Sequence, residues 1–195
     1  MKGAICGSAG FTSQYHLSRP VLKGEKIDFF MSHSWHDDWV EKFKKLELLA
    51  GAFHAKHGRY PTFWLDKACV DQDRISDCLK VLPINVMACN KVLVLVGDTY
   101  ATRLWCVWEL FILFAFARNN EALEKVVVVP LHGENQLEGL ESFDVAGARC
   151  YDPNEEARLL HVIEVVGTDA FNSKIRSLAT MVRGASVRPM ISSQS

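Results

Sequence analysis

Glu109 is the one charged residue inside a long apolar stretch that runs from Arg103 to Arg118 (RLWCVWELFILFAFAR). If the stretch is a helix, Trp105 lies one turn before Glu109 on the same face, which places an indole ring beside a carboxylate. A carboxylate in such surroundings is paired with another group, used for binding or catalysis, or kept as a solubilising charge at an edge. The stretch alone leaves these three interpretations open.

The periodicity of this stretch predicts a helix with two largely apolar faces. The expected core face carries Val107, Leu110, Phe111 and Phe114, and the opposite face carries Trp105, Glu109, Ile112 and Phe116. A surface helix would fill its second face with Lys, Glu and Gln. We therefore expect the first face to pack on a sheet, and Ile112 and Phe116 on the second face to point toward a partner.

The composition is that of a globular domain. The chain has 195 residues, of which 49% are hydrophobic and 23% are charged, and a chain of this length buries roughly 70% of its surface. The net charge of -1 gives no reason to expect nucleic acid as a partner. The longest apolar run is shorter than the about 18 residues that span a bilayer, so we expect no membrane insertion.

The sequence lacks the common metal, cofactor and nucleophile motifs. The six cysteines are scattered without a CxxC pair, which is typical of reduced thiols in a cytoplasmic protein. His33 and His36 have no nearby Cys or His to complete a metal site. The sequence contains no GxGxxG, GxxxxGK[ST] or GxSxG motif, so we expect neither a bound cofactor nor a nucleophilic serine.

Apolar strands alternate with amphipathic helices along the chain. The expected strands cover residues 27–31, 60–65, 91–96 and 125–131, with a short edge strand at 148–151. The expected helices cover residues 37–56, 74–90, 103–118, 153–166 and 169–183, with Pro83 breaking or restarting the second. This alternation predicts a doubly wound α/β fold with a parallel sheet. Ligands of such folds bind at the carboxyl ends of the strands, which the start of the Glu109 helix adjoins.

Two blocks of the sequence resemble the Toll/interleukin receptor (TIR) domain family. The block IDFFMSHSWHDD resembles the first TIR strand and the turn and acids that follow it. The block from TFWLDKACVDQ to CNKVLVLVGDTYATRLWCVWELFIL resembles the second strand, the BB loop, the third strand and the Ser/Thr-x-x-Trp-Cys-x-x-Glu-Leu helix. The resemblance covers roughly residues 26–166 and implies a flavodoxin-like, three-layer α/β/α fold with a central parallel sheet.

The resemblance also implies an activity, because some TIR domains cleave NAD+ at the nicotinamide glycosidic bond. Their catalytic glutamate matches Glu109, which predicts an NAD+ glycohydrolase that releases nicotinamide and gives ADP-ribose or a cyclic product. The substrate-binding residues implied in addition are Trp105, His33, Ser34, Trp35 and Asp66. NAD+ is then the substrate and no cofactor is needed.

The alternative within the same family is a non-catalytic interaction module that acts by homotypic assembly. Both interpretations imply a signalling role in the cytoplasm, of the kind found in innate immunity, and a homo-oligomer formed through TIR–TIR contacts. We expect residues 1–24 to form a leader, residues 25–168 the TIR-like domain, and residues 169–195 a C-terminal helix and tail.

Overall fold

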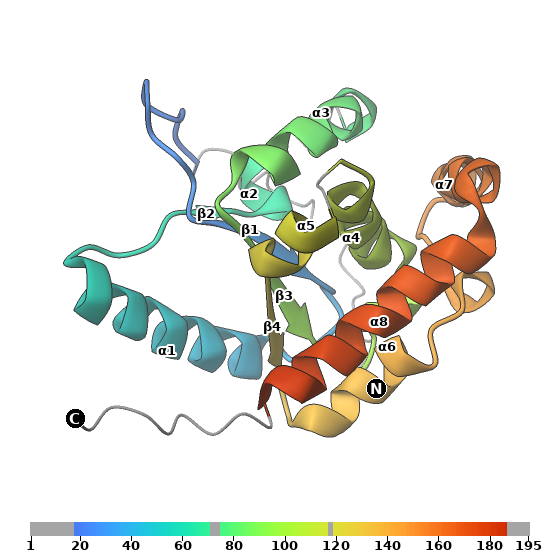
Figure 1. The fold of residues 1–195 in the computed structure, drawn as a ribbon. Coiled ribbons are helices and arrows are strands. Elements are labelled where there is room, and N and C mark those ends of the chain that lie inside the picture. The colour runs from blue at the N-terminus through green and yellow to red at the C-terminus, as the bar shows by residue number, and fades with distance from the viewer. Residues whose placement is uncertain (1–17, 71–74, 117–118, 187–195) are drawn as a thin grey trace, which may run out of the picture.

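The central element of the fold is a parallel sheet of four strands in the order β2-β1-β3-β4. A computed structural model describes residues 18–70, 75–116 and 119–186 (Figure 1). Its strands are β1 (Phe29–His33), β2 (Phe63–Trp64), β3 (Lys91–Val96) and β4 (Val126–Pro130). This strand order is that of flavodoxin-like doubly wound folds.

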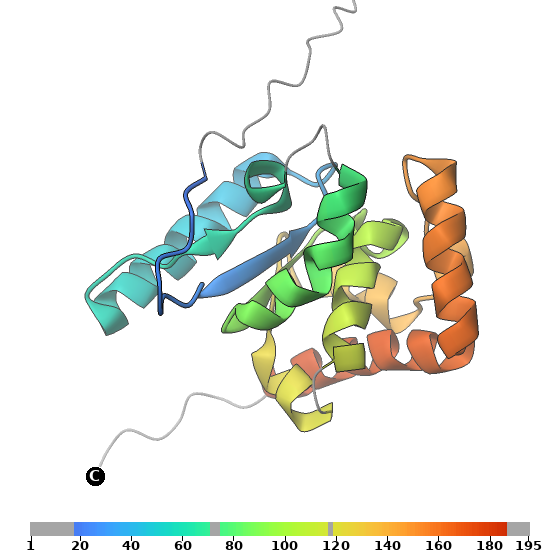
Figure 2. The ribbon, with the colours of Figure 1, turned by 90° about the horizontal axis from the view of Figure 1, so that it is seen from above.

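Helices cover both faces of the sheet. The longer helices are α1 (Trp39–His57), α3 (Ile75–Ala88), α4 (Leu104–Phe116), α7 (Pro153–Val166) and α8 (Thr168–Ser186). The shorter ones are α2 (Asp66–Cys69), α5 (Asn119–Lys125), α6 (Glu138–Glu141), η3 (Tyr100–Thr102), η4 (Glu134–Leu137) and η5 (Val145–Gly147). Seen from above, α1 lies on one side of the sheet and α3 and α4 lie on the other (Figure 2). The α/β class and the three-layer, flavodoxin-like architecture are therefore confirmed.

The alternation of side chains along the strands divides the core into two parts. Phe30, Val92 and Val94 face α3 and α4, whereas Phe29 and Leu93 pack under α1. Successive side chains of a strand point to opposite faces, so an uninterrupted apolar strand supplies both cores at once. None of the helices in the described part of the chain is long and apolar enough to cross a membrane.

The C-terminal helix expected near residues 169–183 is present as α8 and joins the α4 core. The Phe171 ring lies edge-on to Phe111, with 5.1 Å between ring centroids, and to Phe143, with 5.7 Å between centroids. The buried Asn172 accepts a hydrogen bond from the Val145 N–H at 3.0 Å. These contacts hold α8 and the η5 turn against α4 at the edge of the sheet.

Several expected boundaries were wrong. The first strand extends to His33, because Ser32 and His33 continue the ladder opposite Val94 and Leu95. The second strand is only two residues long, since Pro61 has no N–H to donate.

The N–H of Thr62, just before this second strand, binds the Asp28 carboxylate at 2.8 Å instead of a sheet partner. Pro83 stands inside the continuous helix α3, where its neighbours Leu82 and Val86 are buried in the core. The expected edge strand at 148–151 is a single bridge between Arg149 and Arg103.

Gly97 connects β3 to the next turn, and a side chain at this position would have no space. A Cβ built on Gly97 would lie 2.3 Å from Cγ of Asp37. That carboxylate is fixed in place, because its Oδ1 accepts the Thr99 N–H at 2.8 Å and the Thr99 hydroxyl at 2.7 Å. The turn after β3 and the start of α1 are thus packed through one glycine.

We predict that Gly97→Ala lowers the free energy of unfolding by about 1–3 kcal/mol, the usual cost of forcing extra atoms into a packed site. The matched control is Gly51→Ala in α1, where an added Cβ meets nothing within 4 Å. That variant should gain about 0.5–1 kcal/mol, because alanine favours helix more than glycine does. Urea unfolding of both variants provides the measurement. Equal stability of Gly97→Ala and the wild type would contradict the packing described.

Candidate functional site

The candidate site lies at the carboxyl ends of β1 and β3, where α4 crosses the sheet. It contains four residues that we call the Glu109 cluster, namely Glu109, Asp66, Ser32 and Tyr100. They come from α4, α2, β1 and η3 in that order. The parallel sheet brings these elements together because the carboxyl ends of its strands share one edge.

Glu109 is buried in the second turn of α4, with 8% of its surface exposed. Burial raises the pKa of the Glu109 carboxyl well above its ordinary value, and the nearby Asp66 carboxylate raises it further. Hydrogen bonding by the Ser32 hydroxyl acts in the opposite direction. Because desolvation disfavours the charged form of an acid, the carboxyl is biased toward its protonated state.

Asp66 begins the short helix α2 and supplies a second carboxyl. One oxygen accepts the backbone N–H of Lys67 at 2.6 Å, and the other accepts the indole N–H of Trp35 at 3.0 Å. Burial of the carboxyl nevertheless raises the pKa of Asp66 to about 6, against these two bonds and the charge of Lys67. Two neighbouring acids with raised pKa values are typical of functional sites.

Trp35 forms the outer wall of the cluster. Its side chain is 46% exposed, and its ring lies under the Lys67 ammonium group, 5.3 Å from the ring centroid. The bond from Trp35 to Asp66 joins the loop after β1 to α2. Trp35 and Asp66, which the sequence names as candidate site residues, are therefore in contact in the structure.

The other expected site residues have different surroundings. His33, the last residue of β1, has its pKa lowered to about 4 by burial and then by the charge of Lys42. The Ser34 hydroxyl forms a 2.7 Å hydrogen bond with the Thr99 hydroxyl. Trp105 is partly buried and packs against the main core.

One residue on the second face of α4 does not have the surroundings that the sequence predicted. Ile112 is only 2% exposed and belongs to the core, so the prediction that it points toward a partner was wrong. Phe116 is 64% exposed. Ile112 lies three residues after Glu109 on the same side of α4, and it packs in the main core that includes Phe30 of β1.

Three polar residues of this region were missed from the sequence. Ser32 lies on the same face of β1 as the buried Phe30. Had the predicted first strand continued two residues further, it would have placed Ser32 toward α4. Tyr100 is fully buried, and its hydroxyl lies 2.7 Å from that of Ser32. Lys42 occupies an inward position of α1, one turn before Leu46, and its Nζ donates to the Ser34 carbonyl at 2.7 Å.

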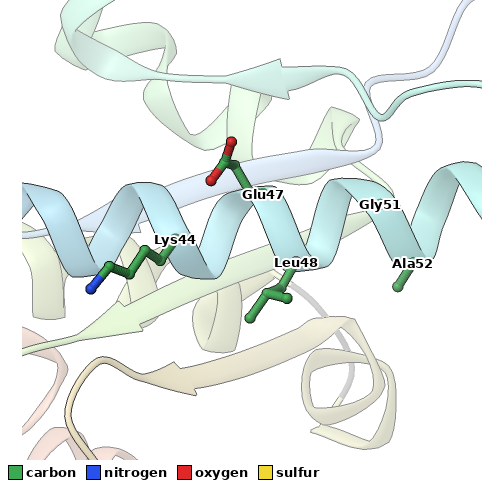
Figure 3. Close-up of a pocket in the computed structure, with 5 residues that line it drawn as sticks. All are labelled: Lys44, Glu47, Leu48, Gly51 and Ala52. Atoms are coloured by element: carbon green, nitrogen blue, oxygen red, sulfur yellow. The ribbon is translucent and has the colours of Figure 1, made fainter.

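Two open hollows lie outside the Glu109 cluster. The first is lined by Lys44, Glu47, Leu48, Gly51 and Ala52, all from α1 (Figure 3). The second surrounds Arg59 and Tyr60 at the amino ends of the strands, the edge opposite to the one where ligands of this fold bind. Among the residues that the structure describes, no group of three or more His, Cys, Asp or Glu side chains could hold a metal ion.

Comparison with known proteins gives one structural match. No protein-family model matches the chain, and no curated protein matches it significantly. A solved structure of the TIR domains in the activated Roq1 resistosome, which directly recognises the pathogen effector XopQ, is similar at 16% sequence identity with a TM-score of 0.40. The match covers 79% of this chain and 84% of the other. The assignment of the fold rests on the strand order and the packing described above.

The raised pKa of Glu109 predicts a pH-dependent cost of folding. The folded state holds a proton on Glu109 at pH values where the unfolded chain has lost it, so stability falls as pH rises above the ordinary range of a glutamate. Asp66 contributes in the same direction between about pH 4 and 6.

We predict that Glu109→Gln, which keeps the shape without the charge, is more stable than the wild type at pH 8 and shows a flatter decline between pH 5 and 8. The urea midpoint across this range provides the measurement. The exposed Glu164, treated as Glu164→Gln, should leave the wild-type slope unchanged. Identical slopes for Glu109→Gln and the wild type would show that Glu109 ionises without cost.

Proposed function

We propose that this chain is a TIR-type NAD+ glycohydrolase in which Glu109 is the catalytic residue. The observation that supports the proposal most is a buried carboxyl with a raised pKa, set beside a second acid at the carboxyl ends of parallel strands. That edge is where flavodoxin-like folds bind their ligands. The TIR resemblance around Trp105 and Glu109 indicates NAD+ as the ligand.

The reaction suits a site with a single central carboxylate. The bond between ribose C1′ and the pyridinium nitrogen breaks, and nicotinamide leaves as a neutral base with the electron pair, so no acid has to protonate it. A positive charge develops on the ribosyl group, and a carboxylate close to C1′ stabilises it electrostatically. Water then attacks C1′, gives ADP-ribose and releases one proton. Attack by a nitrogen of the adenine ring would give a cyclic product instead.

Burial of Glu109 is compatible with this role because the substrate is a cation. An opposite charge within a few ångströms favours the ionised form of an acid. Entry of the pyridinium ring beside Glu109 therefore lowers the pKa of the carboxyl. The enzyme would hold a neutral acid at rest and expose a carboxylate only to the cationic substrate, in a site of low polarity where their attraction is strong.

The positions of the other candidate site residues give each of them a role in substrate binding. In this proposal Asp66 accepts hydrogen bonds from the ribose hydroxyls and Trp105 contacts the nicotinamide ring. His33, Ser34 and Trp35 line the entrance from the loop after β1. Because Trp35 is bonded to Asp66 over the cluster, the substrate enters when this loop and α2 move apart.

We predict that the purified protein releases nicotinamide from NAD+ and that Glu109→Gln lowers the rate about a hundredfold or more, since its side chain cannot carry the negative charge. The measurement is nicotinamide release followed by chromatography, with the far-ultraviolet circular dichroism of the variant as the check on folding. The exposed Glu164 on α7 supplies the matched control, and Glu164→Gln should cleave NAD+ at the wild-type rate. Equal turnover by Glu109→Gln and the wild type would exclude Glu109 as the catalytic residue.

A second candidate function, assembly with further copies of the chain, is favoured by the surface of α1. Trp39 is 76% exposed and Phe43 is 58% exposed, and the two lie one helical turn apart on the same face. Exposed aromatic side chains that gather on one face mark interaction sites. Such assembly would serve a cytoplasmic signalling role with or without NAD+ cleavage.

We predict that the double substitution Trp39→Ser and Phe43→Ser reduces self-association without loss of folding, because it removes the aromatic contact area of this face. Sedimentation velocity at increasing protein concentration measures the change. The control is Leu48→Ser, an equally exposed apolar residue on another side of α1. A wild type that stays monomeric at all concentrations would refute the assembly proposal.

A further inference from the structure

The loop after β1 is held at two points by one residue of the turn after β3, Thr99. The Thr99 N–H donates to Oδ1 of Asp37 at 2.8 Å, and the Thr99 hydroxyl donates to the same oxygen at 2.7 Å. This hydroxyl also lies 2.7 Å from the hydroxyl of Ser34. Ser34 and Asp37 are three positions apart in the chain, so the tip of the loop consists of the two residues between them.

Ser34 forms the fixed base of this tip, because its backbone is bonded as well as its side chain. Its carbonyl oxygen accepts hydrogen bonds from Nζ of Lys42 at 2.7 Å and from the Asp37 N–H at 3.3 Å. Its hydroxyl oxygen accepts the His36 N–H at 3.3 Å. Both Ser34 and Lys42 are buried. The base of the tip is therefore bonded to α1, to the turn after β3 and to the tip itself.

The number of protons in this network sets the direction of its bonds. The Thr99 hydroxyl has a single proton, which it donates to Asp37. The short contact between the two hydroxyls then requires the proton of Ser34, which is also single. The Ser34 hydroxyl is thus engaged inside the loop, and the group that the tip presents to the outside is the indole of Trp35.

The tip brings this indole to α2. The Trp35 N–H donates to Oδ2 of Asp66 at 3.0 Å, although the side chain is half-exposed. Ordering a free loop residue costs conformational entropy, which opposes a single hydrogen bond of an exposed group. The anchors on Thr99 order the tip beforehand, so the bond to Asp66 has less entropy to overcome.

We propose that Thr99 is a positioning residue that holds Trp35 against Asp66 and so keeps the entrance of the site closed in the substrate-free protein. The effect on catalysis rests on the proposed NAD+ cleavage, in which the substrate enters when Trp35 and Asp66 separate. The placement of Trp35 is a property of the protein without substrate and can be tested by itself.

Thr99→Val keeps the shape of the side chain and removes the hydroxyl that links Ser34 to Asp37. We expect the Trp35 indole N–H to exchange with water about tenfold faster, the size of the effect of one hydrogen bond to a charged group. Ser34→Ala breaks the same link from its other side and should raise the exchange rate in the same direction. Thr99→Ser keeps the hydroxyl and should restore the wild-type rate.

Water exchange of the five tryptophan indoles is measured by 1H–15N NMR, and the Trp35 signal is assigned through its loss in Trp35→Phe. The buried Trp64 is the internal reference, because a merely structural role of Thr99 would lower the stability of the whole fold and affect both signals. The matched control is Thr102→Val, which removes the neighbouring hydroxyl that donates to the Thr99 carbonyl at 2.9 Å. This control should leave the exchange of Trp35 unchanged.

Unchanged exchange of Trp35 in Thr99→Val, or equal acceleration of Trp35 and Trp64, would overturn the proposal. If Thr99→Val does not fold, Ser34→Ala decides the matter by the same two signals. An unchanged Trp35 signal in Ser34→Ala would then show that the link does not hold the tip.

With NAD+ present, Thr99→Val should lower KM about tenfold and leave kcat within about twofold, because a larger open fraction raises the apparent affinity by the same factor. Faster indole exchange with an unchanged KM would overturn the closing role. A protein that cleaves no NAD+ but shows the faster exchange would refute the proposed function and support the positioning by Thr99. A protein that cleaves NAD+ with KM and Trp35 exchange unaltered in Thr99→Val would refute this inference alone.

Discussion

The burial of the Glu109 carboxyl at the end of β1 is the constraint on which the candidate site depends. An acid without water around it is costly to ionise, and a folded chain accepts that cost only where other contacts outweigh it. The surrounding core supplies these contacts, because Val107, Leu110 and Phe111 on the same helix are buried. A buried acid that is costly to ionise and is held in place by a well-packed helix is the arrangement expected of a residue kept for binding or chemistry.

The Asp66 carboxylate joins two segments at this edge of the sheet. Trp35 and α2 meet through the bond between the Trp35 indole and Asp66, which closes the cluster from outside. In the same region, Asp37 accepts a hydrogen bond from the Thr99 N–H in the turn after β3 and packs on Gly97. The loop after β1 is thus anchored at its base, and at its tip Trp35 contacts Asp66 and Lys67 of α2. In the proposed function this tip is the part that opens for the substrate.

The sequence predicted the fold class, the order of most elements and the position of Glu109 on an apolar helix, because these depend on local periodicity. The length of β1 was not predictable in this way. Ser32 and His33 are polar, and they belong to the strand only because Val94 and Leu95 lie opposite them. The polar residues around Glu109 could not be found for the same reason, since Ser32 and Tyr100 are distant in sequence and their hydroxyls meet through tertiary packing.

The sequence also could not predict the surroundings of side chains that lie between two elements. The helical pattern of α4 gave its core face correctly, but Ile112 on the other face is buried in the same core. Lys42 appeared as one of several lysines of α1, although its ammonium group is held by the Ser34 carbonyl. Such cases arise because periodicity shows which residues share a face and cannot show what covers it.

A crystal structure of Glu109→Gln soaked with NAD+ would locate the substrate, because this variant should bind NAD+ without consuming it. We expect the nicotinamide riboside at the carboxyl ends of β1, β2 and β3, with its C1′ atom against the side chain of residue 109 and with Trp35 displaced from Asp66. NAD+ bound at another surface, or a cluster that stays closed at saturating NAD+, would contradict it.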